Sequence, residues 1–169
     1  TINTDFAQVE VDEQQVNLTR FGLFHPETRD FFLENSNFFT MGTGASFTST
    51  PVQTDLFFSR KIGLSDTGQP VPILGGARLT GKVGKNSIAV LDVQTDSAFG
   101  KPGDNFFVSR YSRDVLRRSR IGAIFINKES VDGSQHFNRT MGVDGNFSLG
   151  NSFQVSSYVA KTATNPDAP

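Results

Sequence analysis

The chain has 169 residues with 16 basic and 17 acidic side chains, which give a formal net charge of −1. This near-neutral balance argues against a nucleic-acid-binding protein, because a phosphate-binding surface normally carries a basic excess. No apolar run approaches the roughly 20 residues of a transmembrane helix, whereas a membrane β-strand needs only about 9–11 residues with alternate apolar positions. The length suits a single unit over residues 1–169, and the lack of Cys excludes disulfides and thiolate metal sites.

The first informative stretch runs from Asn17 to Asn35 and reads NLTRFGLFHPETRDFFLEN. Pro26 is a favoured first helical residue, and Glu27 behind it suits the positive end of a helix dipole. The pattern predicts a short helix from Pro26 to Asn35 with one apolar and one charged face.

A long loop is predicted next, because residues 37–54 are rich in Gly, Ser and Thr. If this loop and the preceding helix fold inward, residues 17–54 form a plug inside a barrel. Arg20, Glu27, Arg29, Asp30 and Glu34 would then pair with Arg60 and Arg78, which makes these seven residues the candidate binding site.

Residues 55–162 alternate between apolar and polar side chains, with turn signals about every ten residues, which predicts antiparallel hairpins. The hairpins are expected at residues 77–93, 105–128 and 137–162, and Gly75 and Gly76 are expected to form a bend or bulge. In the first hairpin we expect one apolar face that combines the residues Ala77, Leu79, Gly81, Val83, Ala89, Leu91 and Val93.

The fold class is therefore all-β, an antiparallel meander with one short helix and a long loop near the N-terminus. A soluble sandwich would give similar alternation. Strands of nine residues or more, charges on the non-apolar face and the lack of crossover signals favour part of a membrane β-barrel. The ends of the sequence, TINTDFAQ and TATNPDAP, suggest a fragment of a larger barrel domain.

Several longer motifs match one family: TDFAQVEVD at 4–12, NLTRF at 17–21, LFFSRKIGL at 56–64, PVPILGGARLTGKVG at 70–84 and NFFVSRYSRDVLRRSRIGAIF at 105–125. The chain resembles the barrel region of bacterial outer-membrane proteins of unknown function that carry an N-terminal family-nine-type carbohydrate-binding domain. The resemblance implies an outer-membrane location, contact with outer-membrane lipid, a carbohydrate-binding domain in the parent chain, and a carbohydrate or another solute as ligand.

The basic run RDVLRRSR, residues 113–120, is interpreted as a solvated hairpin tip rather than a nucleic-acid site, because the chain as a whole is nearly neutral. In an outer-membrane protein it could also meet anionic lipopolysaccharide.

No catalytic residue, metal site or cofactor is predicted. His25 and His136 belong to no metal-spaced motif, and strand alternation by itself brings acidic residues such as Asp92 and Asp96 onto one face. The alternative function is a soluble carbohydrate-binding or carbohydrate-hydrolysing domain that stacks sugars on Phe106, Phe107, Tyr111 or Tyr158. Aromatic girdles at two levels of one face would favour the membrane, and clustering in one groove would favour the soluble domain.

Overall fold

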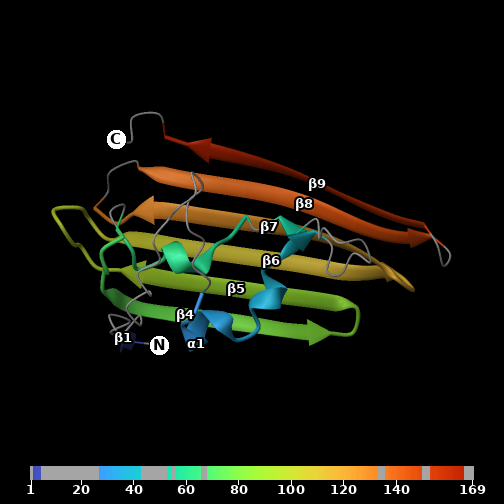
Figure 1. The fold of residues 1–169 in the computed structure, drawn as a ribbon, viewed down its shortest axis with the longest axis horizontal. Helices are drawn as coiled ribbons and strands as arrows, with labels where there is room; N and C mark the ends of the chain where they lie inside the picture. The colour runs from blue at the N-terminus through green and yellow to red at the C-terminus, as the bar shows by residue number, and fades with distance from the viewer. Residues whose placement is uncertain are drawn as a thin grey trace, which may run out of the picture.

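The fold is an antiparallel sheet with three short helical turns on one of its faces, as seen in a computed structural model (Figure 1). The structure describes residues 2–4, 27–42, 53–54, 56–65, 68–132, 136–149 and 153–165. No helix in these ranges is long and apolar enough to cross a membrane.

Six strands form the meander: β4 (Ile73–Val83), β5 (Asn86–Thr95), β6 (Asp104–Leu116), β7 (Ser119–Ser130), β8 (Phe137–Leu149) and β9 (Phe153–Thr164). Each strand pairs with the next in sequence, and β1 (Ile2–Thr4) pairs antiparallel with the start of β4. The all-β meander predicted from alternation is confirmed, with the three hairpins at the expected places. Among the described residues the sheet is open, and β9 forms one of its edges.

The predicted irregularity at Gly75 and Gly76 is also confirmed, because the β4–β5 register shifts between Ile73 and Gly75. A residue with a side chain would be crowded at Gly76, where an added Cβ would lie 3.1 Å from Val93 and 3.2 Å from the Asp92 carbonyl oxygen.

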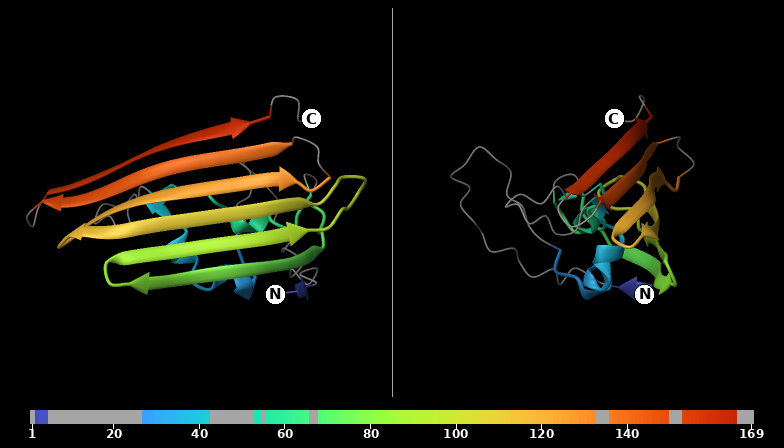
Figure 2. Two further views of the ribbon diagram at one scale, coloured as in Figure 1. Left: turned by 180° about the vertical axis from the view of Figure 1, so that it is seen from behind. Right: turned by 90° about the vertical axis from the view of Figure 1, so that its right-hand side faces the viewer.

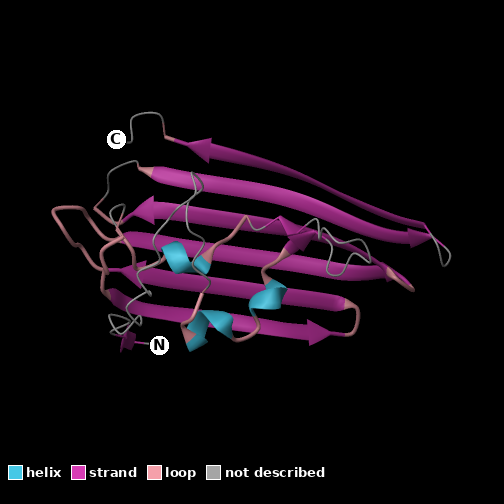
Figure 3. Ribbon diagram, viewed as in Figure 1, coloured by secondary structure: helices cyan, strands magenta, loops and turns pink. Residues whose placement is uncertain are grey.

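The N-terminal elements all lie on one side of this sheet, as the end-on view in Figure 2 and the colouring in Figure 3 show. They are α1 (Asp30–Leu33), η2 (Ser36–Phe38), η3 (Ser59–Lys61) and a small ladder of β2 (Met41–Gly42) with β3 (Gln53–Thr54). The side of the sheet that they occupy is called the covered face. The opposite side, on which no described element lies, is called the open face.

The predicted helix is shorter than expected and starts later, at Asp30 rather than at Pro26. Residues 27–29 are not helical, and Arg29 is extended. The Glu27 carboxylate accepts hydrogen bonds from the backbone amides of Thr28 and Arg29. The helix ends within one turn, since Asn35 adopts a left-handed conformation with φ of 56°. Of the predicted long loop, residues 43–52 lie outside the described part of the chain.

The hydrophobic core lies between the covered face and these N-terminal elements. Phe32, Phe39, Met41 and Ile62 meet a floor of buried strand residues, Ile73, Ala89, Leu91, Val93, Val108 and Ile124. The strand floor is therefore made by residues of β4 to β7 that share one face of the sheet, and the alternate residues point to the open face.

The expected single apolar face of the first hairpin is wrong. The two-residue turn at Gly84 and Lys85 sets a register in which Arg78 lies opposite Leu91 and Leu79 lies opposite Val90. Because paired residues share a face, Leu79 belongs to the open face and Leu91 to the core. Both faces of the sheet therefore carry apolar side chains, one set buried by the N-terminal elements and the other uncovered.

Candidate functional site

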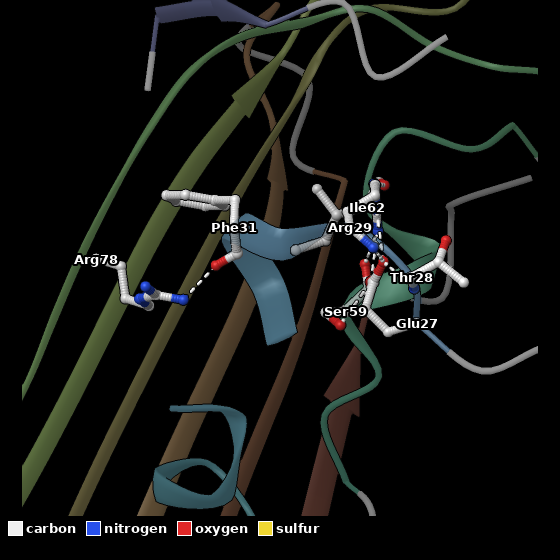
Figure 4. Close-up of polar contacts among 7 residues, drawn as sticks. All are labelled: Glu27, Thr28, Arg29, Phe31, Ser59, Ile62 and Arg78. Carbon is white, nitrogen blue, oxygen red and sulfur yellow. Dashed lines mark hydrogen bonds and ion pairs between the residues drawn. The ribbon is translucent and has the colours of Figure 1, made fainter. Parts of the chain in front are cut away.

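The seven candidate residues fall into two separate clusters on the covered face rather than one network. The first joins Glu27 and Arg29 to η3, and the second joins Arg78 of β4 to α1 (Figure 4). Arg20 lies outside the described residues. Asp30 is exposed at the start of α1, and Arg60 is buried within η3.

In the first cluster, the Arg29 guanidinium donates to both carboxylate oxygens of Glu27 at 2.7 Å. The same guanidinium donates to the carbonyls of Ile62 at 2.6 Å and Ser59 at 2.8 Å, and it lies 4.3 Å from the centroid of the Phe32 ring. Ser59 Oγ donates to Glu27 Oε2 at 2.7 Å. These bonds hold the chain before α1 against η3 and Ile62, with 30 to 33 residues of sequence between the bonded partners.

The pKa of Glu27 is lowered from its ordinary value of 4.5. Burial acts to raise this pKa, but hydrogen bonds from the Arg29 and Ser59 side chains and the Arg29 backbone, together with the Arg29 charge, outweigh it. The carboxylate thus stays charged and fixed inside the cluster.

We expect the ion pair of Glu27 and Arg29 to make the free energy of unfolding depend on pH in the acidic range. Since the folded pKa lies below the unfolded one, the stabilisation is complete above about pH 5, begins to fall near the ordinary value of 4.5, and is lost as pH drops through the folded pKa. Glu27→Gln should flatten the fall in urea midpoint between about pH 5 and pH 3. The matched control is Glu34→Gln, whose carboxylate is 71% exposed; an equal flattening there would contradict the assignment to Glu27.

In the second cluster, the Arg78 guanidinium donates to the carbonyls of Phe31 and Glu34 and to the Glu34 carboxylate. These carbonyls lie at the C-terminal end of α1, where the last turn of a helix leaves acceptors unpaired and a cation is favoured. Arg78 also lies 5.3 Å from the Phe31 ring centroid. One strand cation therefore fixes the helix onto the sheet.

A third charged group, which the sequence reasoning missed, lies deeper on the covered face. Arg110 of β6 and Asp144 of β8 form a two-pronged ion pair at 2.5 and 2.9 Å, and both side chains are 5% exposed. The pair spans the intervening strand β7 at Gly122, where an added Cβ would lie only 2.6 Å from the guanidinium. The signal in the sequence was the Gly between two covered-face charges, which only the register makes visible.

The covered face changes character towards β9. From β4 to β7 it carries paired charges, whereas on β8 and β9 it presents neutral groups in addition to Asp144. Asn138 Nδ2 donates to Thr164 Oγ1 at 3.1 Å, and the hydroxyls of Thr140 and Thr162 lie 2.9 Å apart. Tyr158 adds a ring that is 44% exposed.

The open face carries an apolar band bounded by polar rows. Cross-strand register places Leu79, Val90, Ser109, Phe125 and Met141 in one row, which ends at Lys161 on the edge strand β9. The next row contains Gly81, Ile88, Tyr111, Ala123, Val143 and Val159. On one side, the row of Asp92, Asn127 and Arg139 follows, and then that of Gln94, Asn105 and Glu129. These polar groups bond to each other, as in Asn105 to Asp92 at 2.8 Å and Arg139 to Asn127 at 2.9 Å.

Large side chains of the band are strongly exposed, including Met141 at 60%, Val143 at 57% and Val159 at 71%. Large contiguous apolar patches are rare on the surface of soluble monomers and usually mark a contact with another molecule or a membrane. Within the described residues no group of three His, Asp or Glu side chains could hold a metal ion.

Comparison with known proteins gives one result on the family. Residues 1–80 match a domain of unknown function (DUF5916). No curated protein and no solved structure matches the chain. The match covers the N-terminal elements and β4 as far as Thr80, so it includes both charged clusters around α1.

Proposed function

We propose that this chain forms part of the wall of a bacterial outer-membrane β-barrel, completed by strands outside this chain. The open face would contact lipid and the covered face, with α1, η2 and η3 as a plug segment, would face the interior. The observation that carries the proposal is the exposed apolar band with polar borders on a sheet whose other face holds paired charges. Transmembrane barrel strands alternate in this way between lipid and interior.

The open face stays apolar towards the end of the sheet where the β8–β9 connection lies. In β5 the band ends at Ile88, whereas on β8 and β9 Phe147, Val155 and Phe153 follow beyond Gly145 and Ser157. Phe153 is 59% exposed and Val155 is 40% exposed. Exposed apolar side chains along the strand length fit the lipid-facing side of a membrane barrel.

The aromatic side chains of the open face lie near the two borders of the apolar band. Phe107 and Phe125, with ring centroids 6.3 Å apart, lie at the polar border of the open face, and Tyr111, Phe147 and Phe153 lie towards the opposite border. In membrane β-barrels, aromatic side chains form one ring at each of the two membrane–water interfaces. For the soluble alternative, the four stacking candidates would have to share a groove, but Phe106 and Tyr158 lie on the covered face and Phe107 and Tyr111 on the open face.

The solute that this barrel handles is proposed to be a carbohydrate or another neutral polar compound. The family resemblance implies the sugar, and the amide and hydroxyl groups on the covered face of β8 and β9 offer the donors and acceptors that a hydroxyl-rich ligand needs. The exposed Tyr158 ring could stack on a sugar ring.

The test places a charge in the middle of the apolar band. Val143→Arg in the full-length protein should lower the free energy of folding into phosphatidylcholine vesicles by about 2–4 kcal/mol, because a cation on the lipid face is costly at mid-depth. Asn127→Arg in the polar border row is the matched control and should have a small effect. Folding is measured by the mobility shift between boiled and unboiled samples in detergent gels.

If the open face contacts water instead of lipid, the opposite result is expected. Val143 is 57% exposed, so in a soluble protein Val143→Arg would change stability by less than about 0.5 kcal/mol. That outcome, together with recovery of the parent protein in the soluble fraction without a heat-dependent mobility shift, would overturn the proposal and favour the soluble carbohydrate-binding domain.

A further inference from the structure

A basic rim surrounds one end of the sheet, where the β4–β5 and β6–β7 turns lie. It contains six cations, Lys82, Lys85, Arg113, Arg117, Arg118 and Arg120, and one carboxylate, Asp114. The two turns are joined by a hydrogen bond from the Asp114 amide to the Lys85 carbonyl at 2.8 Å. The rim is therefore one continuous surface rather than two independent hairpin tips.

Most of the positive charge on this rim is not neutralised by the described part of the chain. Asp114 accepts from Lys82 and from Arg120, each at 2.8 Å, and these bonds lower the pKa of its carboxyl. Both carboxylate oxygens are thus occupied. Lys85, Arg113, Arg117 and Arg118 are exposed and have no carboxylate partner among the described residues.

The two ends of the sheet differ in charge. The opposite end carries five acidic residues and three basic ones, Asp92, Asp96, Asp104, Glu129, Asp132, Lys101, Lys128 and Arg139. At this end Lys128 pairs with Asp104 at 3.0 Å, and Arg139 pairs with Glu129 at 3.4 Å. Among the described residues, the end with the two turns therefore has an excess of cations, and the opposite end has an excess of carboxylates.

Exposed apolar side chains are interspersed with these cations. Val83 is 79% exposed and Leu116 is 58% exposed beside the turns, and Arg113 lies opposite Ile121 on the open face. Exposed apolar side chains would contribute nothing to the binding of an anion that is dissolved in water. A membrane interface, where acyl chains meet head groups, needs both kinds of group side by side.

We propose that the basic rim binds the phosphate groups of lipid head groups at the border of the apolar band. The inference rests on the proposed membrane location of the open face and adds its lipid partner. Arg113 is placed at head-group level by its row, next to Tyr111, whose hydroxyl donates to Asn86 at 2.8 Å. Guanidinium groups suit phosphate because their planar fork donates two parallel hydrogen bonds.

The experiment compares two spin-labelled lipids around the full-length protein reconstituted in phosphatidylcholine membranes. Phosphatidylglycerol is the probe and phosphatidylcholine the reference, and electron paramagnetic resonance measures the fraction of each lipid that the protein immobilises. At low salt we expect a preference for phosphatidylglycerol of about five-fold or more, since one basic residue near an anionic surface contributes roughly that factor. The triple variant Arg113→Gln, Arg117→Gln, Arg118→Gln, which leaves Lys85 in place, should lower the ratio several-fold.

The matched control removes the same charge from the other end, as Lys101→Gln, Lys128→Gln, Arg139→Gln, and should keep the preference. Equal immobilisation of both lipids by the wild type, or an equal loss in both triple variants, would overturn the lipid inference while the membrane location stands. A protein that enters no membrane and immobilises neither lipid would overturn the proposed function and the inference with it.

Discussion

Asp144→Asn is expected to lower the free energy of unfolding by about 3–5 kcal/mol, because it leaves the Arg110 guanidinium charged, buried and without its counter-ion. Both partners are 5% exposed, and their two-pronged contact spans the strand between them. The amide of Asn can replace only one acceptor and supplies no negative charge.

This result is checked by urea unfolding of the purified protein in detergent, followed by circular dichroism. Asp92→Asn is the matched control, since Asp92 is an exposed carboxylate of the same sheet that accepts one hydrogen bond from Asn105. We expect the double variant Arg110→Met, Asp144→Leu to lose less than Asp144→Asn alone, because it leaves no buried charge. A double variant that loses more than Asp144→Asn would contradict this account.

Gly103→Ala should destabilise the protein by about 1–3 kcal/mol through overpacking against a neighbouring backbone. Gly103 is buried just before β6, and a Cβ added there would overlap the carbonyl oxygen of Thr95. Neither side can yield easily. The Gly103 carbonyl accepts from the Val131 amide at 3.0 Å, and the Thr95 hydroxyl bonds to the backbone of Asp104.

Gly81→Ala provides the control within the same sheet. An added Cβ at Gly81 meets nothing within 4 Å, and Gly81 has no positive φ. Its substitution should leave the thermal midpoint unchanged or raise it, because Ala has less conformational freedom to lose on folding. If the two glycines respond alike, the close approach at Thr95 does not set the stability of this end of the sheet.

The hairpins could be predicted from the sequence because their signals are local. Alternation with a period of two, interrupted by short turns, depends on residues that are neighbours in the chain. The pairing of Arg78 with Leu91 could not be predicted with the same certainty, because a slip of one residue in the turn exchanges the two faces of a strand. Our assignment of Leu79 and Leu91 to one face failed for this reason.

The charged clusters could not be predicted in full either, because their partners lie far apart in the sequence. Glu27 and Arg29 lie two residues apart, yet the partners that complete their cluster, Ser59 and Ile62, come from a segment about 30 residues later. Arg110 and Asp144 drew no attention in the sequence, because each is a lone charge in an alternating strand. Only pairing through β7, with Gly122 between them, brings the two side chains together.

By itself, the sequence determined the class of this protein: an all-β meander with a short helical segment before it, since alternation and turn residues act over a few residues. The tertiary structure alone decided which alternate set of side chains is covered, where the buried charges meet, and that an apolar band faces outward. Those features depend on strand register and on the side of the sheet to which the N-terminal elements pack, and both are set by contacts between segments far apart in the chain.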